Sequence, residues 1–249
     1  MKKVAEVNLI FWIMKICATT LGETAGDMFS MTLNIGYGLS SILLIGLFIV
    51  SLIAQLLSKK YNPILFWFVI LTTSTAGTTM SDFMDRTLGF GYAKGSLILV
   101  FLLLSILLVW RKSEKSLSVT DIKTFRPELF YWITILISNT LGTALGDYLA
   151  DDSGLGFFGG ALLIGLLILF VVLLKYATKI STVLLFWIAF VLTRPFGATF
   201  GDLLTKPIEK GGLNLGTIGS SSVLFIMLSL LIIYSVIDKN KQNANKKTS

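Results

Sequence analysis

Long apolar runs separated by short polar segments dominate the chain. Taken as helices, they cover residues of roughly 7–28, 37–57, 62–83, 92–110, 127–149, 157–175, 180–203 and 213–237. Each run is close to the ~20 residues with which an α-helix crosses the ~30 Å hydrocarbon core of a bilayer. Helices are required because lipid offers no partner to backbone N–H and C=O groups. The pattern therefore predicts an all-α integral membrane protein with eight transmembrane helices.

Composition supports this class and excludes several kinds of chemistry. Of 249 residues, 54% are hydrophobic and 14% are charged, and the mean hydropathy is +0.81. A soluble domain carries about 25% charged residues. The chain has no histidine, and Cys17 is its single cysteine. An internal disulfide is thus impossible, and the usual zinc, haem and histidine-based acid–base sites are excluded.

The basic residues indicate membrane topology rather than nucleic-acid binding. The net charge is +7, but the 21 Lys and Arg residues lie mostly at the ends of the apolar runs. Eight crossings place both termini on one side, which carries fifteen basic residues against four on the other. Because cytoplasmic loops are rich in Lys and Arg, we expect both termini in the cytoplasm. The remaining two, Lys15 and Arg194, fall inside predicted helices.

A gapless repeat organises the chain. A glycine follows each of four tryptophans by ten residues, and an aspartate follows by fifteen. The members are Trp12, Gly22 and Asp27; Trp67, Gly77 and Asp82; Trp132, Gly142 and Asp147; and Trp187, Gly197 and Asp202. Each repeat spans two helices, so all copies enter the membrane in the same direction. The tryptophans are 55, 65 and 55 residues apart, which indicates a duplicated pair.

The expected architecture is four parallel two-helix repeats with 2+2 pseudo-symmetry. The repeats occupy residues 1–60, 61–110, 127–179 and 180–237, with a cytoplasmic linker at 111–126 and a disordered cytoplasmic tail at 238–249. Each tryptophan lies near the cytoplasmic end of its helix, where an amphipathic ring suits the membrane interface. Small residues four apart, such as Gly22 and Gly26, favour close helix packing. Alternatively, these glycines unwind the helix and present carbonyl oxygens to an ion.

Four segments around the glycines and aspartates resemble a family of bacterial membrane proteins. They are TTLGETAGD at 19–27, TAGTTMSD at 75–82, NTLGTALGDYLAD at 139–151 and TRPFGATFGDLLTKP at 193–207. The family consists of uncharacterised, membrane-anchored proteins with four tandem repeats, each of two transmembrane segments with a characteristic tryptophan. The resemblance covers nearly the whole chain. It implies the architecture and a multi-pass location in the bacterial inner membrane, and it leaves the function to be argued from the residues.

Oxygen-bearing side chains recur on one face of the repeat helices. Positions 8, 11 and 15 after each tryptophan share a face, and in the first three repeats all of them carry side-chain oxygens. The candidate cation ligands are Glu23, Asp27, Asp82, Asp147 and Asp202, and the candidate substrate pathway comprises Thr20, Thr75, Thr78, Asn139, Thr140, Thr143, Arg194 and Thr199. A charge inside the bilayer costs about 2.5–3.5 kcal/mol on insertion scales, so the carboxylates need a partner or water.

Three partners for the carboxylates are open. The aspartates cap helix ends or meet interfacial water, or Lys15 and Arg194 pair with at most two of them, or a cation binds. Without histidine, an all-oxygen site suits hard cations such as magnesium, calcium, manganese or an alkali ion. Arg194 is expected to be the counter-ion of a neighbouring aspartate, or else a gate or an anchor for an anionic substrate. Lys15 has the same alternatives, or it snorkels to the cytoplasmic face.

The predicted function is transport of a small cation, with a divalent metal such as manganese as the candidate. The segment ETAGD at 23–27 is similar in composition to Glu-x-Gly-Asp motifs of some cation exporters, with a spacing one residue longer. The alternatives are a membrane scaffold or sensor with a purely structural polar face and, third, a small organic solute transporter. No nucleophile or cofactor motif accompanies the carboxylates, so we expect neither an enzyme nor a cofactor. The expected partners are the bilayer and a small cation, with no nucleic acid.

Overall fold

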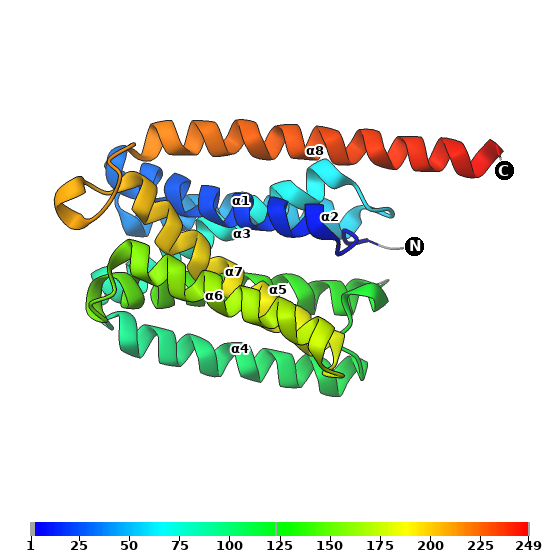
Figure 1. The fold of residues 1–249 in the computed structure, drawn as a ribbon, viewed down its shortest axis with the longest axis horizontal. Coiled ribbons are helices and arrows are strands. Elements are labelled where there is room, and N and C mark those ends of the chain that lie inside the picture. Colours follow the sequence, from blue (N-terminus) through cyan, green and yellow to red (C-terminus); the bar gives the residue numbers. More distant parts are fainter. Residues whose placement is uncertain (1–2, 123, 249) are drawn as a thin grey trace.

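Eight helices run alternately in opposite directions, and α1 begins at the end of the bundle where α8 ends (Figure 1). The computed structural model describes residues 3–122 and 124–248, without the side chains of 121 and 239–248. The long helices are α1 (Leu9–Asp27), α2 (Tyr37–Leu57), α3 (Pro63–Asp82), α4 (Tyr92–Glu114), α5 (Phe125–Asp147), α6 (Gly156–Ala177), α7 (Thr182–Thr205) and α8 (Thr217–Thr248). The described residues contain no strand, which confirms the all-helical class.

Within the described residues, seven of the eight long helices are long and apolar enough to cross a membrane. The exception is α1, which carries Lys15, Glu23 and Asp27. The predicted tail at 238–249 falls almost wholly on residues whose side chains lie outside the described part of the chain, and α8 is bounded at Thr248. The expectation of disorder there stays a prediction.

Four helices form a closed inner ring. In this ring α1 packs on α3, α3 on α5, α5 on α7 and α7 back on α1. The second helix of each repeat packs outside, on the first helix of the next repeat, so that α2 covers α3, α4 covers α5, α6 covers α7 and α8 covers α1. The inner helices all run in the same direction (Figure 1). The packing of the helices is therefore four-fold cyclic, whereas the predicted 2+2 arrangement has only two-fold pseudo-symmetry.

Composition explains which helix of each repeat lies inside. The outer helices are nearly all apolar and stay largely uncovered, with Leu97 and Phe101 of α4 each 72% exposed. The inner helices α3, α5 and α7 bury more than half of their most apolar stretch and are rich in Gly, Ser and Thr. Small residues allow the close approach that a ring of four helices needs.

The inner helices touch at the repeated glycines. A Cβ atom on Gly77 would lie 2.9 Å from Cβ of Asn139 and 3.0 Å from the backbone N of Thr140. The equivalent glycines meet equivalent residues of the next repeat: Gly22 meets Ser74, Gly142 meets Arg194 and Gly197 meets Thr19. All four remain within regular α-helix. The predicted packing role is confirmed, and the alternative of unwinding at these glycines is not observed.

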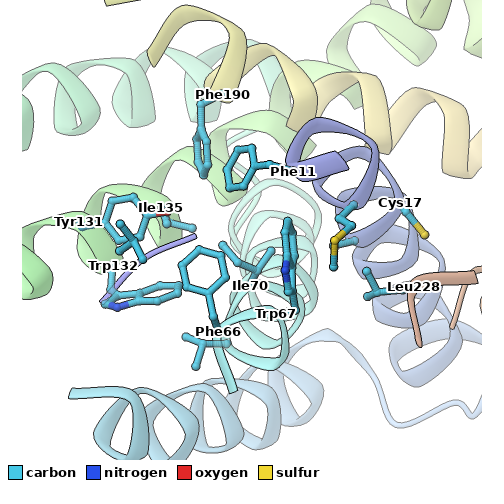
Figure 2. Packing of buried hydrophobic residues seen from close by; sticks show 14 of the residues in the cluster. Phe11, Cys17, Phe66, Trp67, Ile70, Tyr131, Trp132, Ile135, Phe190 and Leu228 are labelled. Carbon is cyan, nitrogen blue, oxygen red and sulfur yellow. The ribbon is translucent and has the colours of Figure 1, made fainter. Parts of the chain in front are cut away.

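The repeated tryptophans are core residues. Trp67, Trp132 and Trp187 are buried, and each packs on the aromatic residue that precedes the tryptophan of the previous repeat. Figure 2 shows this for Trp67 beside Phe11 and for Trp132 beside Phe66. The ring centroids are 5.6 Å apart for Phe11 and Trp67, 5.5 Å for Phe66 and Trp132, 6.3 Å for Tyr131 and Trp187, and 5.7 Å for Phe186 and Trp12. The expectation of interfacial anchors is wrong for Trp67, Trp132 and Trp187, because their large rings fill the space between the inner helices, whereas Trp12 is only partly buried.

Replacing Gly77 with alanine should destabilise the fold by about 1–3 kcal/mol, since the added methyl group would collide with the backbone of α5. The control is Gly46→Ala on the exposed face of α2, where a Cβ would have no neighbour within 4 Å. Removing a helical glycine there should be neutral or slightly stabilising. Thermal unfolding of both purified variants in detergent measures the difference. An equally small effect at both positions would contradict the close-packing role.

Candidate functional site

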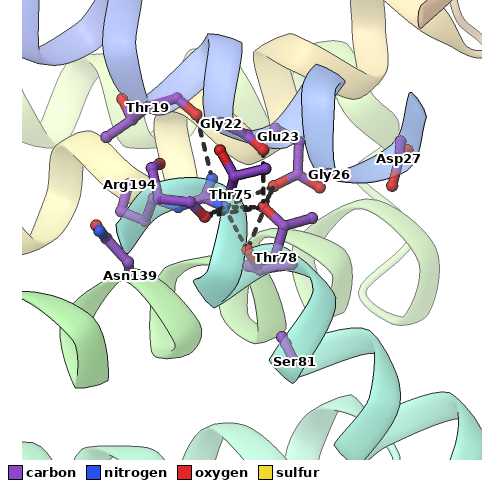
Figure 3. A network of polar contacts seen from close by, with 12 residues as sticks. Thr19, Gly22, Glu23, Gly26, Asp27, Thr75, Thr78, Ser81, Asn139 and Arg194 are labelled. Atoms are coloured by element: carbon purple, nitrogen blue, oxygen red, sulfur yellow. Dashed lines mark hydrogen bonds and ion pairs between the residues drawn. The ribbon is translucent and has the colours of Figure 1, made fainter. Parts of the chain in front are cut away.

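A fully buried arginine lies at the centre of the inner ring. Arg194 of α7 is 0% exposed, and its Nη2 donates to Glu23 Oε2 at 2.9 Å and to Thr143 Oγ1 at 2.7 Å. The same nitrogen donates to the hydroxyl of Thr78. One arginine thus joins side chains of α1, α3 and α5 to α7. Figure 3 shows Glu23 of α1 and Thr78 of α3 beside Arg194.

The sequence makes room for this arginine. Its stem lies against Gly142, where a Cβ would be 2.3 Å from Arg194 Cγ, so a larger residue at 142 would displace it. Its counter-ion is Glu23, eleven residues after the first tryptophan, and Thr78 and Thr143 occupy the same place in the next two repeats. The expectation that Arg194 pairs with an aspartate is therefore corrected, because the glutamate side chain is long enough to reach the axis.

The four repeated aspartates lie beyond this centre and are paired by two basic residues. Arg86 contacts Asp82 at 2.9 Å and Asp147 at 3.3 Å. Lys206 contacts Asp202 at 3.0 Å and also Asp27. All four carboxylates are buried. We call these two arrangements the Arg86 clamp and the Lys206 clamp, since each joins two neighbouring repeats.

The clamps are two-fold symmetric within a four-fold ring. Both basic residues stand nineteen positions after their tryptophan, where the first and third repeats have Met31 and Asp151 instead. The clamps therefore join repeats two and three and repeats four and one. These are the two interfaces that no short loop of the chain connects. The predicted 2+2 pattern is thus present in the charges, although helix packing is four-fold.

The surroundings of Lys206 favour its charged form. Burial disfavours the charged form of Lys206, but the carboxylates of Asp202 and Asp27 outweigh this effect and keep the pKa of Lys206 above its usual value.

Wide π-helical turns follow the aspartate in three repeats, at Met28–Thr32, Phe83–Thr87 and Tyr148–Asp152. Such turns redirect the chain next to the carboxylates and are frequent at functional sites.

Three carboxylates converge near the axis, and two of them come from repeats three and four, whose interface has no clamp. One oxygen each of Glu23, Asp147 and Asp202 lies within 4.8 Å of the other two. The whole network has five carboxylates and three basic partners, Arg194, Arg86 and Lys206. Carboxylates that outnumber their basic partners at such a spacing attract a proton or a cation.

The predicted pathway residues divide into two groups. Thr78, Thr143 and Arg194 contact Glu23 directly. The others lie outside this contact: Thr20, Thr75, Thr140 and Thr199 donate to the carbonyl oxygen four residues earlier in their own helix, and Asn139 donates to Thr73. Of positions 8, 11 and 15 after each tryptophan, mainly positions 11 and 15 therefore supply side chains to the buried charged network.

Sequence reasoning missed three charged residues of the buried networks. Arg86 and Lys206 were counted only as outer-loop charges, although each follows an aspartate by four residues, which is the spacing of a helical ion pair. At the opposite end of the bundle, Glu128 is fully buried and pairs with Lys3 at 2.7 Å and with Gln55 at 3.1 Å. This contact ties the N-terminal segment to α2 and α5.

The comparisons with known proteins identify the family. Four successive segments, residues 10–61, 65–116, 130–181 and 185–239, match the model of a family described as Repeat of Unknown Function (DUF347). The chain therefore belongs to this family, and the four tandem repeats are confirmed. Neither the curated proteins nor the solved structures contain a significant match to the chain.

Removal of a clamp cation should destabilise the fold. In Arg86→Met two buried aspartates lose their basic partner, and we expect the free energy of unfolding to fall by roughly 3 kcal/mol. This value is at the low end for a broken buried ion pair, because the Arg86 side chain is 28% exposed. Adding Asp82→Asn and Asp147→Asn to that variant should recover most of this loss. Lys210→Met, at an exposed position, is the control. Thermal unfolding in detergent distinguishes these outcomes, and a stable Arg86→Met protein would refute the clamp.

Proposed function

We propose that this member of the four-repeat family is a multi-pass protein of the bacterial plasma membrane, with both termini in the cytoplasm, that transports a small cation. The exposed apolar faces of α2, α4, α6 and α8 support the membrane location. Apolar surfaces of this size are unfavourable in water and are covered by lipid in a bilayer. The excess of basic residues on the side of the termini supports the orientation.

The convergence of Glu23, Asp147 and Asp202 is the observation on which the transport proposal rests. Their oxygens approach within 4.8 Å in a buried layer between helices that run in the same direction. Buried carboxylates in excess of basic partners are costly in a bilayer unless a positive charge joins them. Oxygen ligands of this type suit a hard cation, and manganese remains the candidate divalent metal.

A second candidate function is a membrane scaffold. It is favoured by a specific observation, since each of the five carboxylates already has a basic partner at ion-pair distance. In that case the network only fixes the register of the four repeats. The two candidates differ in one respect: a transporter must bind or move an ion, whereas a scaffold must only fold.

Growth of a deletion strain across a panel of metal salts, with measurement of cellular metal content, tests the proposal. We expect altered tolerance to one hard cation and a matching change in its cellular content, both restored by the intact gene. No difference for any ion, with normal expression of the protein, would favour the scaffold.

Asp147→Asn should reduce cation transport by about 10–100-fold, because the amide keeps the size of the side chain but removes a charged ligand. The matched control is Asp152→Asn, which changes an exposed aspartate in the π-helical turn that follows Asp147. Transport into proteoliposomes, normalised to folded protein, measures both. Equal activity of the two variants would contradict a role for the buried carboxylates.

Tags at Met1 and at Ser249 should both be accessible only from the cytoplasm, since fifteen of the basic residues lie on that side against four on the other. Protease protection of tagged protein in spheroplasts measures this. An external tag at either end would overturn the orientation.

A further inference from the structure

An ammonium group on the chain itself lies against the carboxylates of the proposed cation site. The Lys206 Nζ contacts Asp202 at 3.0 Å and also contacts Asp27. Asp202 is one of the three residues whose carboxylate oxygens converge within 4.8 Å. A metal ion at that point and the amine of Lys206 therefore share a ligand.

The buried carboxylates are separated from water by the two clamp residues on one side of the network. The clamps lie at the end of the bundle opposite the two chain ends, where α3 and α7 end (Figure 1). The side chains of Lys206 and Arg86 are 19% and 28% exposed, while the aspartates that they contact are at most 5% exposed. The clamp side chains thus reach the outer water, on the side of the membrane opposite the termini.

On the cytoplasmic side, buried side chains close the network. Lys15 lies two turns before Glu23 on α1, its side chain is 0% exposed, and its Nζ has no hydrogen-bond partner among the described residues. The Nζ lies 4.2 Å from the centroid of the Phe190 ring. The expectation that Lys15 pairs with a carboxylate or snorkels to the cytoplasmic face is thus wrong. Nearer the cytoplasm, Trp67 and Trp132 are at most 1% exposed.

The two clamp residues differ in how firmly they are held. The guanidinium of Arg86 lies 5.9 Å from the Tyr37 ring and 5.6 Å from the Tyr92 ring, and it donates to the Tyr37 hydroxyl at 3.3 Å. Within the described part of the chain no aromatic ring lies over Lys206, and its further contact is the Met31 sulfur at 3.9 Å. An ammonium group is also a point charge on a flexible stem, without the fixed fork of a guanidinium. Lys206 is therefore the clamp residue that leaves its carboxylates more easily.

The side chain of Lys206 can leave without movement of the backbone. Its backbone N–H donates to the Asp202 carbonyl at 2.9 Å, and its own carbonyl accepts from the N–H of Asn214 at 2.9 Å. These bonds fix the backbone at the end of α7. Only the flexible stem has to rotate toward the water that it already reaches.

The charge balance of the network favours exchange of this amine for a divalent cation. When all groups are ionised, five carboxylates and three basic side chains carry a net charge of minus two. A monovalent cation that replaces the ammonium group leaves this charge unchanged, whereas a divalent cation lowers it to minus one. Unbalanced charge is costly within a bilayer, so a divalent cation gains more from the exchange.

We propose that Lys206 is a tethered cation that a divalent metal ion displaces on entering the buried carboxylates from the outer side. The ligands of the metal are the carboxylates of Glu23, Asp147 and Asp202, and the released amine turns to the outer water. Ion pairing of every carboxylate is then compatible with a cation site, because one of the basic partners is exchangeable. This inference rests on the proposed cation transport and adds the charge of the cation, its side of entry and the residue that controls its binding.

Chemical labelling of the intact protein in detergent tests the displacement. The protein is acetylated with an amine-reactive reagent in manganese chloride, or in potassium chloride of the same ionic strength, and each lysine is quantified by mass spectrometry. We expect manganese to raise acetylation of Lys206 by roughly tenfold or more. Release from two carboxylates lowers the pKa of the amine, and one pKa unit corresponds to a tenfold larger share of the reactive neutral form. Lys210, which is exposed in the same loop, should react equally in both salts.

Removal of the tethered amine should strengthen metal binding. Lys206→Gln should bind manganese at least about tenfold more tightly than the wild type, because no competitor has to leave first. Manganese should also raise its unfolding temperature by more than that of the wild type. Lys210→Gln is the matched control, and its affinity should equal that of the wild type. The labelling experiment needs no variant, so it decides the question even when Lys206→Gln fails to fold.

The outcomes separate this inference from the proposed function. In a protein that binds manganese, unchanged labelling of Lys206, or an affinity of Lys206→Gln no higher than that of the wild type, would overturn the displacement alone. Absence of binding of every hard cation, in the wild type and in Lys206→Gln, would overturn the proposed function and the displacement with it.

Discussion

Neutralisation of buried carboxylates between closely packed helices is the constraint on which the structure depends. Five of the buried carboxylates form one network in the inner ring, and each of them is within ion-pair distance of a basic side chain from the same or a neighbouring repeat. Removing one member of a buried pair costs more than the pair itself contributes, because the remaining charge stays desolvated. The network therefore holds the four repeats in one register.

Packing and electrostatics follow different symmetries in this structure. Glycines and aromatic rings repeat at all four interfaces, so helix packing alone would produce four equivalent positions around the axis. Charged residues break that equivalence, since Arg86 and Lys206 occur in two repeats only and Arg194 and Lys15 in one repeat each. A site that distinguishes directions or partners needs such asymmetry. The unclamped interface between Asp147 and Asp202 is where the proposed cation site lies.

Lys206, which is partly buried, and Lys15, which is fully buried, illustrate how the environment of an amine determines its partners. Lys206 lies between two carboxylates and stays charged as a structural counter-ion. Lys15 has an aromatic ring and a like-charged arginine as neighbours, and its Nζ makes no hydrogen bond. The same functional group thus forms two ion pairs in one place and has no hydrogen-bond partner in the other.

The sequence by itself determined the all-helical class, the four repeats and the close approach at the glycines. Each of these depends on local periodicity: runs of about twenty apolar residues, a gapless spacing from Trp to Asp, and small residues four apart. Candidate carboxylates were likewise identified, because charged residues in apolar runs stand out in the sequence.

Only the tertiary structure decided how the repeats close on one another and which charges meet. By sequence alone, the tryptophans fit a position at the membrane interface as well as a position in the core. Their burial depends on the aromatic residue of the neighbouring repeat, as for Phe66 and Trp132. The pairing of Arg194 with Glu23, 171 positions apart, and of Lys206 with Asp27, 179 positions apart, requires the ring to close between α7 and α1. Contacts between such distant positions leave no local pattern in the chain, because they depend on the geometry of four helices at once.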